Sequence, residues 1–148
     1  MKLFPAGVCA LAALLLAGCS LAMPRAEREH AYLAAVHAAA GKPVDSFTFV
    51  SGSLYSWRPL DENEVLVYTR PRKAWLLNVG LCPELPYTPT IGLTSHVGRV
   101  SVMTDSVLVA RGHFPCRIQK IQPVDVDQLK QAMAPRKGGT ITPAKASS

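Results

Sequence analysis

From residue 44 onward, the apolar residues of this chain change from helical spacing to the alternating spacing of β-strands. Short alternating runs recur with turn-forming residues between them, and residues 64–69 (EVLVYT) are apolar on both faces, as in a fully buried strand. No segment between the runs has the length and pattern of a crossover helix, which disfavours a parallel sheet. The pattern therefore predicts a mainly β fold, a small antiparallel barrel or sandwich, over residues 44–134.

The expected strands are short, and several are bounded by proline or glycine. They cover residues 44–49, 55–58, 64–69, 75–79, 90–94, 97–103, 106–111 and 116–121. Residues 81–89 hold three prolines and should form an irregular crossing. Asp105 is expected in a hairpin turn, with its carboxylate bonded to its own backbone. In the last run, Ile121 breaks the alternation set by Ile118, which predicts a β-bulge.

A helix is predicted before the strands, over residues 24–41. Pro24 suits its first turn, acidic residues follow at the positive end of the helix dipole, and Gly41 is a suitable C-terminal stop. Its narrow apolar stripe is expected to pack on a sheet; it consists of Tyr32, Leu33, Val36 and Ala40.

A second, shorter helix is predicted near the C-terminus. Asp125 could cap it, and Gln128 stands three residues later, as in a capping box. Val126, Leu129 and Met133 would form its apolar stripe. Residues 135–148 are rich in Gly, Thr, Ser, Lys and Ala and have no periodicity, so this tail is predicted to be disordered.

The N-terminus has the layout of a secretory signal: Lys2, an uncharged apolar stretch and then small residues. The apolar stretch is short for a membrane-spanning helix, which needs about 20 residues. The sequence Leu-Ala-Gly-Cys at residues 16–19 resembles the lipobox of bacterial lipoproteins. The resemblance implies that residues 1–18 are removed and that the thiol of Cys19 carries lipid, with residues 19–43 forming the lipidated N-terminus and first helix. Cys9 lacks this context.

The lipobox resemblance also implies a location. Three acyl chains on Cys19 would hold the chain stably on a membrane, since two or more suffice. Ser20 follows the cysteine in place of Asp, the residue associated with inner-membrane retention, so the prediction is the outer membrane, facing the periplasm. The net charge of +6 includes Lys2. Its excess is spread along the chain, which is typical of a solvated basic surface, with attraction to anionic lipid or polysaccharide as the alternative. No nucleic-acid partner is expected for an exported protein.

Two cysteines, Cys82 and Cys116, remain after the predicted cleavage. In an oxidising compartment such a pair suggests one structural disulfide. Redox catalysis is the first alternative, although it favours a close C-x-x-C pair. A zinc site with His113 and His96 is the second, although only one short ligand spacing is present. We predict no metal and no cofactor.

Several of these residues also occur in a known family. The run Cys82, Leu85, Ile91, Asp105 and Cys116-Arg117-Ile118, preceded by Trp57 and by Ala74-Trp75-Leu76-Leu77, resembles an uncharacterised family of small Gram-negative lipoproteins. That family is defined by a domain of unknown function, and the likeness covers residues 44–124. It implies the same Cys82–Cys116 pairing and the same export route, and it implies no activity.

No catalytic motif stands out in the sequence, which lacks a nucleophile elbow, a zincin motif, a P-loop and a dinucleotide fingerprint. Trp57, Tyr68 and Trp75 could line a ligand pocket, although strand aromatics more often pack in a core. His30 and His37 are expected to face solvent. Two functions stay open: a non-enzymatic envelope module that binds a protein, glycan or lipid, and a small periplasmic hydrolase or transferase whose site is assembled from distant residues. The first is our prediction. Convergence of His96, His113 and an acid would favour the second.

Overall fold

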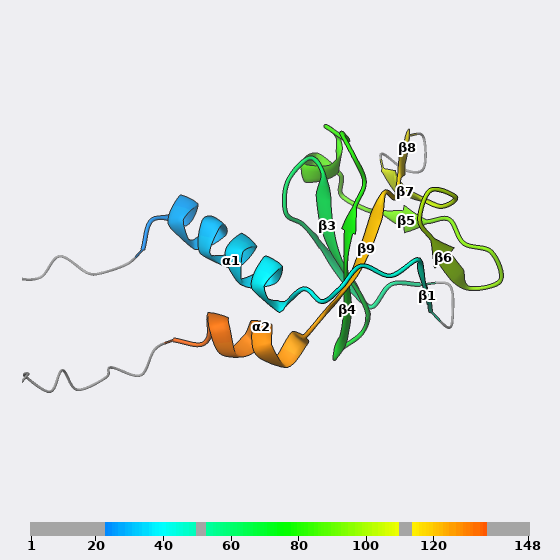
Figure 1. The fold of residues 1–148 in the computed structure, drawn as a ribbon. Helices are drawn as coiled ribbons and strands as arrows, with labels where there is room; N and C mark the ends of the chain where they lie inside the picture. Colours follow the sequence, from blue (N-terminus) through cyan, green and yellow to red (C-terminus); the bar gives the residue numbers. More distant parts are fainter. Residues whose placement is uncertain (1–22, 50–52, 110–113, 136–148) are drawn as a thin grey trace, which may run out of the picture.

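The computed structural model describes residues 23–49, 53–109 and 114–135, which form one domain with helices on one side and β-strands on the other (Figure 1). The helices are α1 (Arg25–Ala39), α2 (Val126–Met133) and the single 3-10 turn η1 (Leu85–Tyr87). The strands are β1 (Ser46–Thr48), β2 (Ser56–Pro59), β3 (Glu64–Arg70), β4 (Lys73–Asn78), β5 (Gly92–Leu93), β6 (Arg99–Ser101), β7 (Ser106–Val109), β8 (Phe114–Arg117) and β9 (Lys120–Val124).

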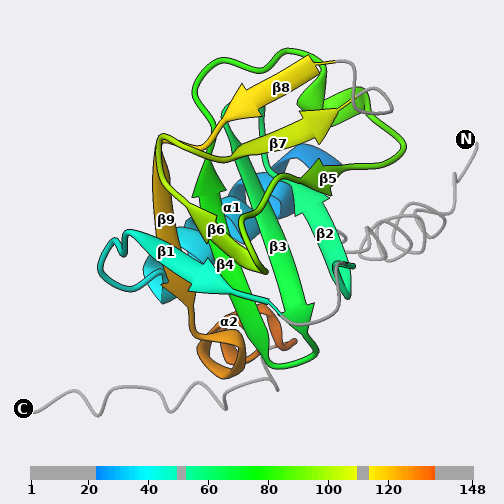
Figure 2. The ribbon, with the colours of Figure 1, turned by 90° about the vertical axis from the view of Figure 1, so that its right-hand side faces the viewer.

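The strands form three antiparallel sheets. The largest has the order β2-β3-β4-β9, and two smaller sheets, β1-β6 and β5-β7-β8, lie in front of it in Figure 2, with α1 behind it. Prolines occupy both outer strands of the large sheet, Pro59 in β2 and Pro123 in β9, where a missing N–H donor is tolerated. The predicted mainly β, antiparallel fold is confirmed. Of its two forms, the described strands make a sandwich-like arrangement and not a closed barrel.

The two faces of the large sheet support two separate hydrophobic cores. The run at residues 64–69 was predicted to be buried on both faces, and it forms most of β3, where the side chains of Val65, Leu66 and Val67 have no exposed surface. Val65 and Val67 pack toward the smaller sheets, whereas Leu66 packs toward the helices. The larger core joins the large sheet to the smaller ones; its buried members include Phe47, Leu77, Val79, Leu85, Val100, Val107, Val109, Ile118 and Ile121.

The smaller core holds the helical layer on the sheet. Its buried members are Val36, Ala39, Leu66, Ala74, Leu76, Val124, Val126 and Leu129. Asp125 caps α2 as predicted, because its carboxylate accepts hydrogen bonds from the backbone N–H groups of Asp127 and Gln128. The side chain of Gln128 instead donates to the carbonyl of Ala38 in α1, and Met133 stays 40% exposed. Part of the predicted apolar stripe of α2 is therefore surface.

The first helix ends earlier than predicted, at Ala39. Ala40 is extended and forms an isolated bridge with Val124. Gly41 does not adopt the left-handed conformation of a helix stop; its N–H donates to the carbonyl of Pro123. A Cβ atom on Gly41 would lie 3.2 Å from the Pro123 ring, so the glycine permits close approach to β9. Along the helix, Val36 is buried and Tyr32 is partly buried, as the predicted stripe requires.

The prediction of one bulged strand over residues 116–121 is wrong. Its residues belong to two strands, β8 and β9, which lie in different sheets. Ile118 and Gln119 connect them, and both Ile118 and Ile121 point into the larger core. The break in alternation therefore marks the point where the chain passes from one sheet to another.

The predicted strand 97–103 is shortened to β6. Val97 and Gly98 adopt positive φ angles of 52° and 72° in a turn that joins His96 to Arg99, and these angles are incompatible with a strand. Asp105 also differs from a simple turn residue, because its buried carboxylate accepts hydrogen bonds from the N–H of Ser101 and the hydroxyl of Thr94. It therefore connects the turn after β6 to the end of β5.

Candidate functional site

The candidate site is an open groove between the two helices and the edge strand β2, which we call the cationic–aromatic groove. Its two adjoining parts have volumes of about 470 Å³ and about 500 Å³, within the usual range of small-molecule sites. Tyr32 and Arg58 line both parts. The first part also includes Arg25, Arg28, Glu29 and Met133; the second includes Tyr55, Ser56, Trp57, Tyr68, Pro71 and Lys130.

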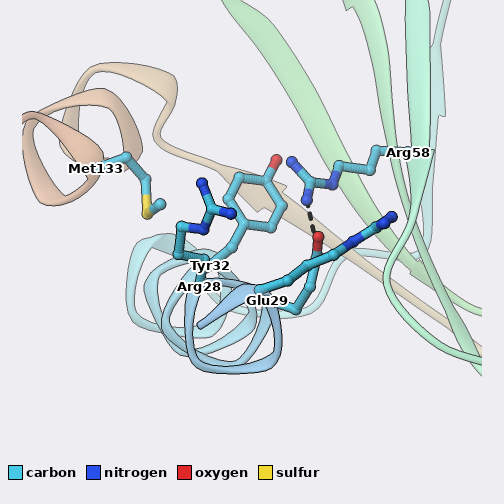
Figure 3. A pocket seen from close by; sticks show the side chains of 6 residues that line it. Arg28, Glu29, Tyr32, Arg58 and Met133 are labelled. Atoms are coloured by element: carbon cyan, nitrogen blue, oxygen red, sulfur yellow. Dashed lines mark hydrogen bonds and ion pairs between the residues drawn. The ribbon is translucent and has the colours of Figure 1, made fainter. Parts of the chain in front are cut away.

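Arg58 is the central cation of this groove. Its guanidinium carbon lies 3.9 Å from the centroid of the Tyr32 ring, and its Nη2 lies 2.9 Å from Oε2 of Glu29. Figure 3 shows Arg58 reaching from β2 to Glu29 on α1, with the Tyr32 ring between Arg28 and Arg58. Because a cation over an aromatic face and an ion pair both restrict the side chain, the guanidinium is held in a defined position.

Tyr68 lines the second part of the groove and is partly buried. Burial and the nearby Tyr32 hydroxyl raise the pKa of Tyr68 to about 12, against a smaller opposing effect of Arg58. The phenol is therefore neutral at physiological pH, and its hydroxyl is hydrogen-bonded to that of Tyr32.

Positive charge exceeds negative charge along the groove. Three arginines and Lys130 line it, whereas Glu29 is its one carboxylate. Arg25 and Arg28 lie in the first turns of α1, where the helix dipole is positive and cations are disfavoured. Among the described residues, Arg58 alone of these four cations forms an ion pair. The arrangement is suited to binding an anion.

The sequence identified one of the groove's aromatic side chains. Tyr68, predicted as a possible pocket residue, lines the groove and also packs against the smaller core. Trp57 alternates with Arg58 along β2 and pairs with Val67, so its ring packs against the larger core on the other face of the sheet. Trp75 does not line the groove. It stacks on Phe47 with the ring centroids 4.8 Å apart, and its indole N–H has no hydrogen-bond partner among the described residues. Trp75 therefore belongs to the larger core.

The cysteine pair forms the predicted disulfide. Cys82 and Cys116 are bonded, with their Cα atoms 5.9 Å apart, and both are buried in the larger core. The bond connects the segment after β4 to β8, so it links the large sheet to the three-stranded sheet. Because each sulfur is bonded to the other, neither is available as a thiolate ligand, which removes the alternative zinc site built on these cysteines.

The histidines have different environments. His30 and His96 are exposed, and His113 lies outside the described residues. His37 is exposed, as predicted, and its Nε2 also lies 2.8 Å from Oε2 of the buried Glu64. No group of three or more His, Cys, Asp or Glu side chains within the described ranges could hold a metal ion. The residues 1–22, including Cys19, also lie outside those ranges.

Sequence reasoning did not find the cations of the groove. Arg25, Arg28 and Arg58 are far apart along the chain or exposed on a helix, and no motif spacing connects them. The one available signal was the placement of two arginines in the first turns of a helix, against the preference of the dipole.

The fold and the groove define a small mainly β domain, covered by two helices, with a cationic–aromatic groove at the edge of its largest sheet. The sequence matches the Family of unknown function (DUF6491) over residues 1–139, so the chain belongs to that family. The predicted membership in a family of unknown function is thereby confirmed, over more of the chain than residues 44–124. No curated protein and no solved structure matches the chain significantly. Neither helix of the described residues has the length and apolar character needed to cross a bilayer.

Proposed function

We propose that this protein is a lipid-anchored lipoprotein of the bacterial envelope, with a folded domain that acts as a non-enzymatic binding module. The observation that carries the anchoring is the sequence Leu-Ala-Gly-Cys at residues 16–19, which follows a signal-like apolar segment. Only a few residues separate Cys19 from the start of α1 at Arg25, so the domain would lie close to its membrane.

The groove supports binding more than catalysis. Its side chains are mainly guanidinium groups and phenols, which recognise ligands through charge and hydrogen bonds. Its one carboxylate, Glu29, is engaged by Arg58, and the described residues that line the groove include no histidine or cysteine. A hydrolase or transferase would need a base beside a nucleophile.

Lipidation is tested by metabolic labelling with an alkyne fatty acid in cells that produce the full chain. We expect the wild type to be labelled and Cys19→Ala to be unlabelled. Cys9→Ala is the matched control, since it removes the other N-terminal cysteine and should keep the label. A labelled Cys19→Ala variant would contradict the proposal.

The outer-membrane location is tested by fractionating inner and outer membranes. The wild type, with Ser20, should be recovered with the outer membrane, and Ser20→Asp should move the protein toward the inner membrane. Recovery of the wild type with the inner membrane would overturn this part of the proposal and leave lipidation intact.

A further inference from the structure

The cationic–aromatic groove has a charge and a position that together identify a class of ligand. We propose that it binds the phosphodiester headgroup of an anionic phospholipid in the membrane that holds the protein. The headgroup chemistry rests on the groove alone, whereas the position of the membrane rests on the proposed lipidation of Cys19.

Most of the positive charges that line the groove are unpaired in the part of the chain that the structure describes. Arg25, Arg28 and Lys130 line the groove and form no ion pair within the described residues. Two of these cations also lie at the positive end of the α1 dipole. An anion bound in the first part of the groove, beside Arg25, Arg28 and Arg58, would complement three of these charges.

The guanidinium of Arg58 is held in a fixed position. Arg58 is held by the Tyr32 ring on one face and by Glu29 through Nη2, so little freedom is lost when its remaining N–H groups meet a ligand. A guanidinium presents planar, paired donors that match the oxygens of a phosphate.

The groove disfavours a cationic headgroup such as choline. Aromatic side chains often surround quaternary ammonium ligands, and this groove has Tyr32, Tyr55 and Tyr68. The Tyr32 face, however, is already occupied by the guanidinium of Arg58, and the unpaired cations nearby would repel another positive charge. The groove therefore favours an anionic lipid over a zwitterionic one.

Exposed methionines near the basic residues favour a lipid over a free phosphate as the ligand. Met133 lines the groove and is 40% exposed, and Met23, two residues before α1, is 59% exposed. Apolar side chains beside basic ones are typical of surfaces that contact the headgroup region of a bilayer. In Figure 1 the first turn of α1 and the last turn of α2 lie on the same side of the molecule, away from the smaller sheets.

Chain length agrees with this position. Five residues lie between Cys19 and Arg25, and the six Cα-to-Cα steps from one to the other can span at most about 20 Å. A lipid on Cys19 would thus keep the open end of the groove within reach of neighbouring headgroups. Basic residues at such a distance are attracted to anionic lipid.

The test uses the full chain in neutral detergent micelles and water-soluble dihexanoyl lipids, so its outcome does not depend on lipidation. Two side-chain N–H resonances report separately: Nε–H of Arg58 lies in the groove, and the indole N–H of Trp75 lies in the larger core. We expect dihexanoylphosphatidylglycerol to shift the Arg58 signal saturably and leave Trp75 unchanged. Dihexanoylphosphatidylcholine and inorganic phosphate should each bind at least about 10-fold more weakly, a difference of 1.4 kcal/mol.

Variants identify the site. Arg28→Gln should weaken phosphatidylglycerol binding about 5-fold, and the Arg25→Gln/Arg28→Gln double variant about 25-fold, since each basic residue near an anionic lipid surface contributes about 1 kcal/mol. Arg117→Gln on β8 removes one exposed charge from the opposite layer and should leave the affinity within 2-fold.

Three results would overturn the inference. Equal affinity for phosphatidylcholine would show that anionic charge is not recognised. Equal affinity for inorganic phosphate would show a general anion site. An unchanged affinity of the Arg28→Gln variant and of the double variant, with the Arg58 shift retained, would place the lipid elsewhere.

Discussion

The two faces of the four-stranded sheet are stabilised in different ways. On one face, the larger core is apolar, encloses the side chains of Val65, Val67 and Leu77, and is closed by the Cys82–Cys116 disulfide. On the other face, ion pairs surround the smaller core: Arg58–Glu29 joins β2 to α1, and Arg72–Asp127 joins the turn between β3 and β4 to α2. His37–Glu64 makes a third such contact.

The difference indicates a division of roles. The β side has the features that maintain a fold, whereas the helical side carries the charged groove and has fewer buried residues beneath it. Binding surfaces are commonly drawn from the less stable parts of a domain. Substitutions on the two faces test this division, beginning with the largest expected effect on stability.

Adjacent leucines in β4 give a matched comparison, because Leu76 faces the helices and Leu77 faces the smaller sheets. We expect Leu77→Ala to lower the free energy of unfolding by about 4 kcal/mol and Leu76→Ala by about 3 kcal/mol, since the helices can shift to fill part of the cavity. Urea denaturation measures both. A larger loss for Leu76→Ala would reverse the proposed division.

The disulfide should be the next largest contribution. Its cysteines are 34 residues apart, and closing a loop of that size is worth about 3–4 kcal/mol through the entropy of the unfolded chain. The Cys82→Ser/Cys116→Ser double variant should lose about this amount in urea denaturation. A loss below 1 kcal/mol would show that the larger core does not depend on the bond.

A smaller effect is expected at the His37–Glu64 contact. His37→Ala leaves the buried carboxylate of Glu64 without its partner, which should cost about 1–2 kcal/mol. His30→Ala, an exposed change in the same helix, is the control and should stay within about 0.5 kcal/mol. If both variants lose the same amount, the His37–Glu64 contact does not stabilise the helical layer.

The smallest effect concerns pH. The pKa of Tyr68 is raised from 10.0 to about 12, so the folded state holds this proton more tightly than the unfolded state. The stability it contributes is complete below pH 10 and is lost as the pH rises from about 10 to about 12. Thermal unfolding at these pH values should show a smaller decline for Tyr68→Phe than for the wild type. Equal declines would mean that Tyr68 ionises normally.

Local patterns in the sequence predicted much of the fold. Alternation identified β3 and β4, the proline-containing turn between them, and the buried character of β3. The cap at Asp125 was also predictable, because an N-cap acts within its own turn. These features depend on neighbouring residues, and their signals lie within a few positions of the chain.

The sequence did not predict the features that depend on contacts between distant segments. Ile118 and Ile121 break a simple alternation because the chain changes sheets between them, and Gly41 is required by the approach of Pro123. The groove was missed for the same reason. Arg58 and Glu29 meet only after β2 has been placed beside α1, and no local pattern records that contact.

The orientation of the domain on the membrane is tested most directly with its own methionines. The full-length lipidated protein, labelled at the methionine methyl groups, would be placed in nanodiscs containing phosphatidylglycerol and a gadolinium-headgroup lipid. Met133 lines the groove and Met23 lies two residues before α1, whereas Met103 follows β6 on the opposite side. We predict that the NMR signals of Met23 and Met133 broaden strongly and that Met103 stays sharp. Broadening of Met103 that equals or exceeds that of Met133 would contradict the account.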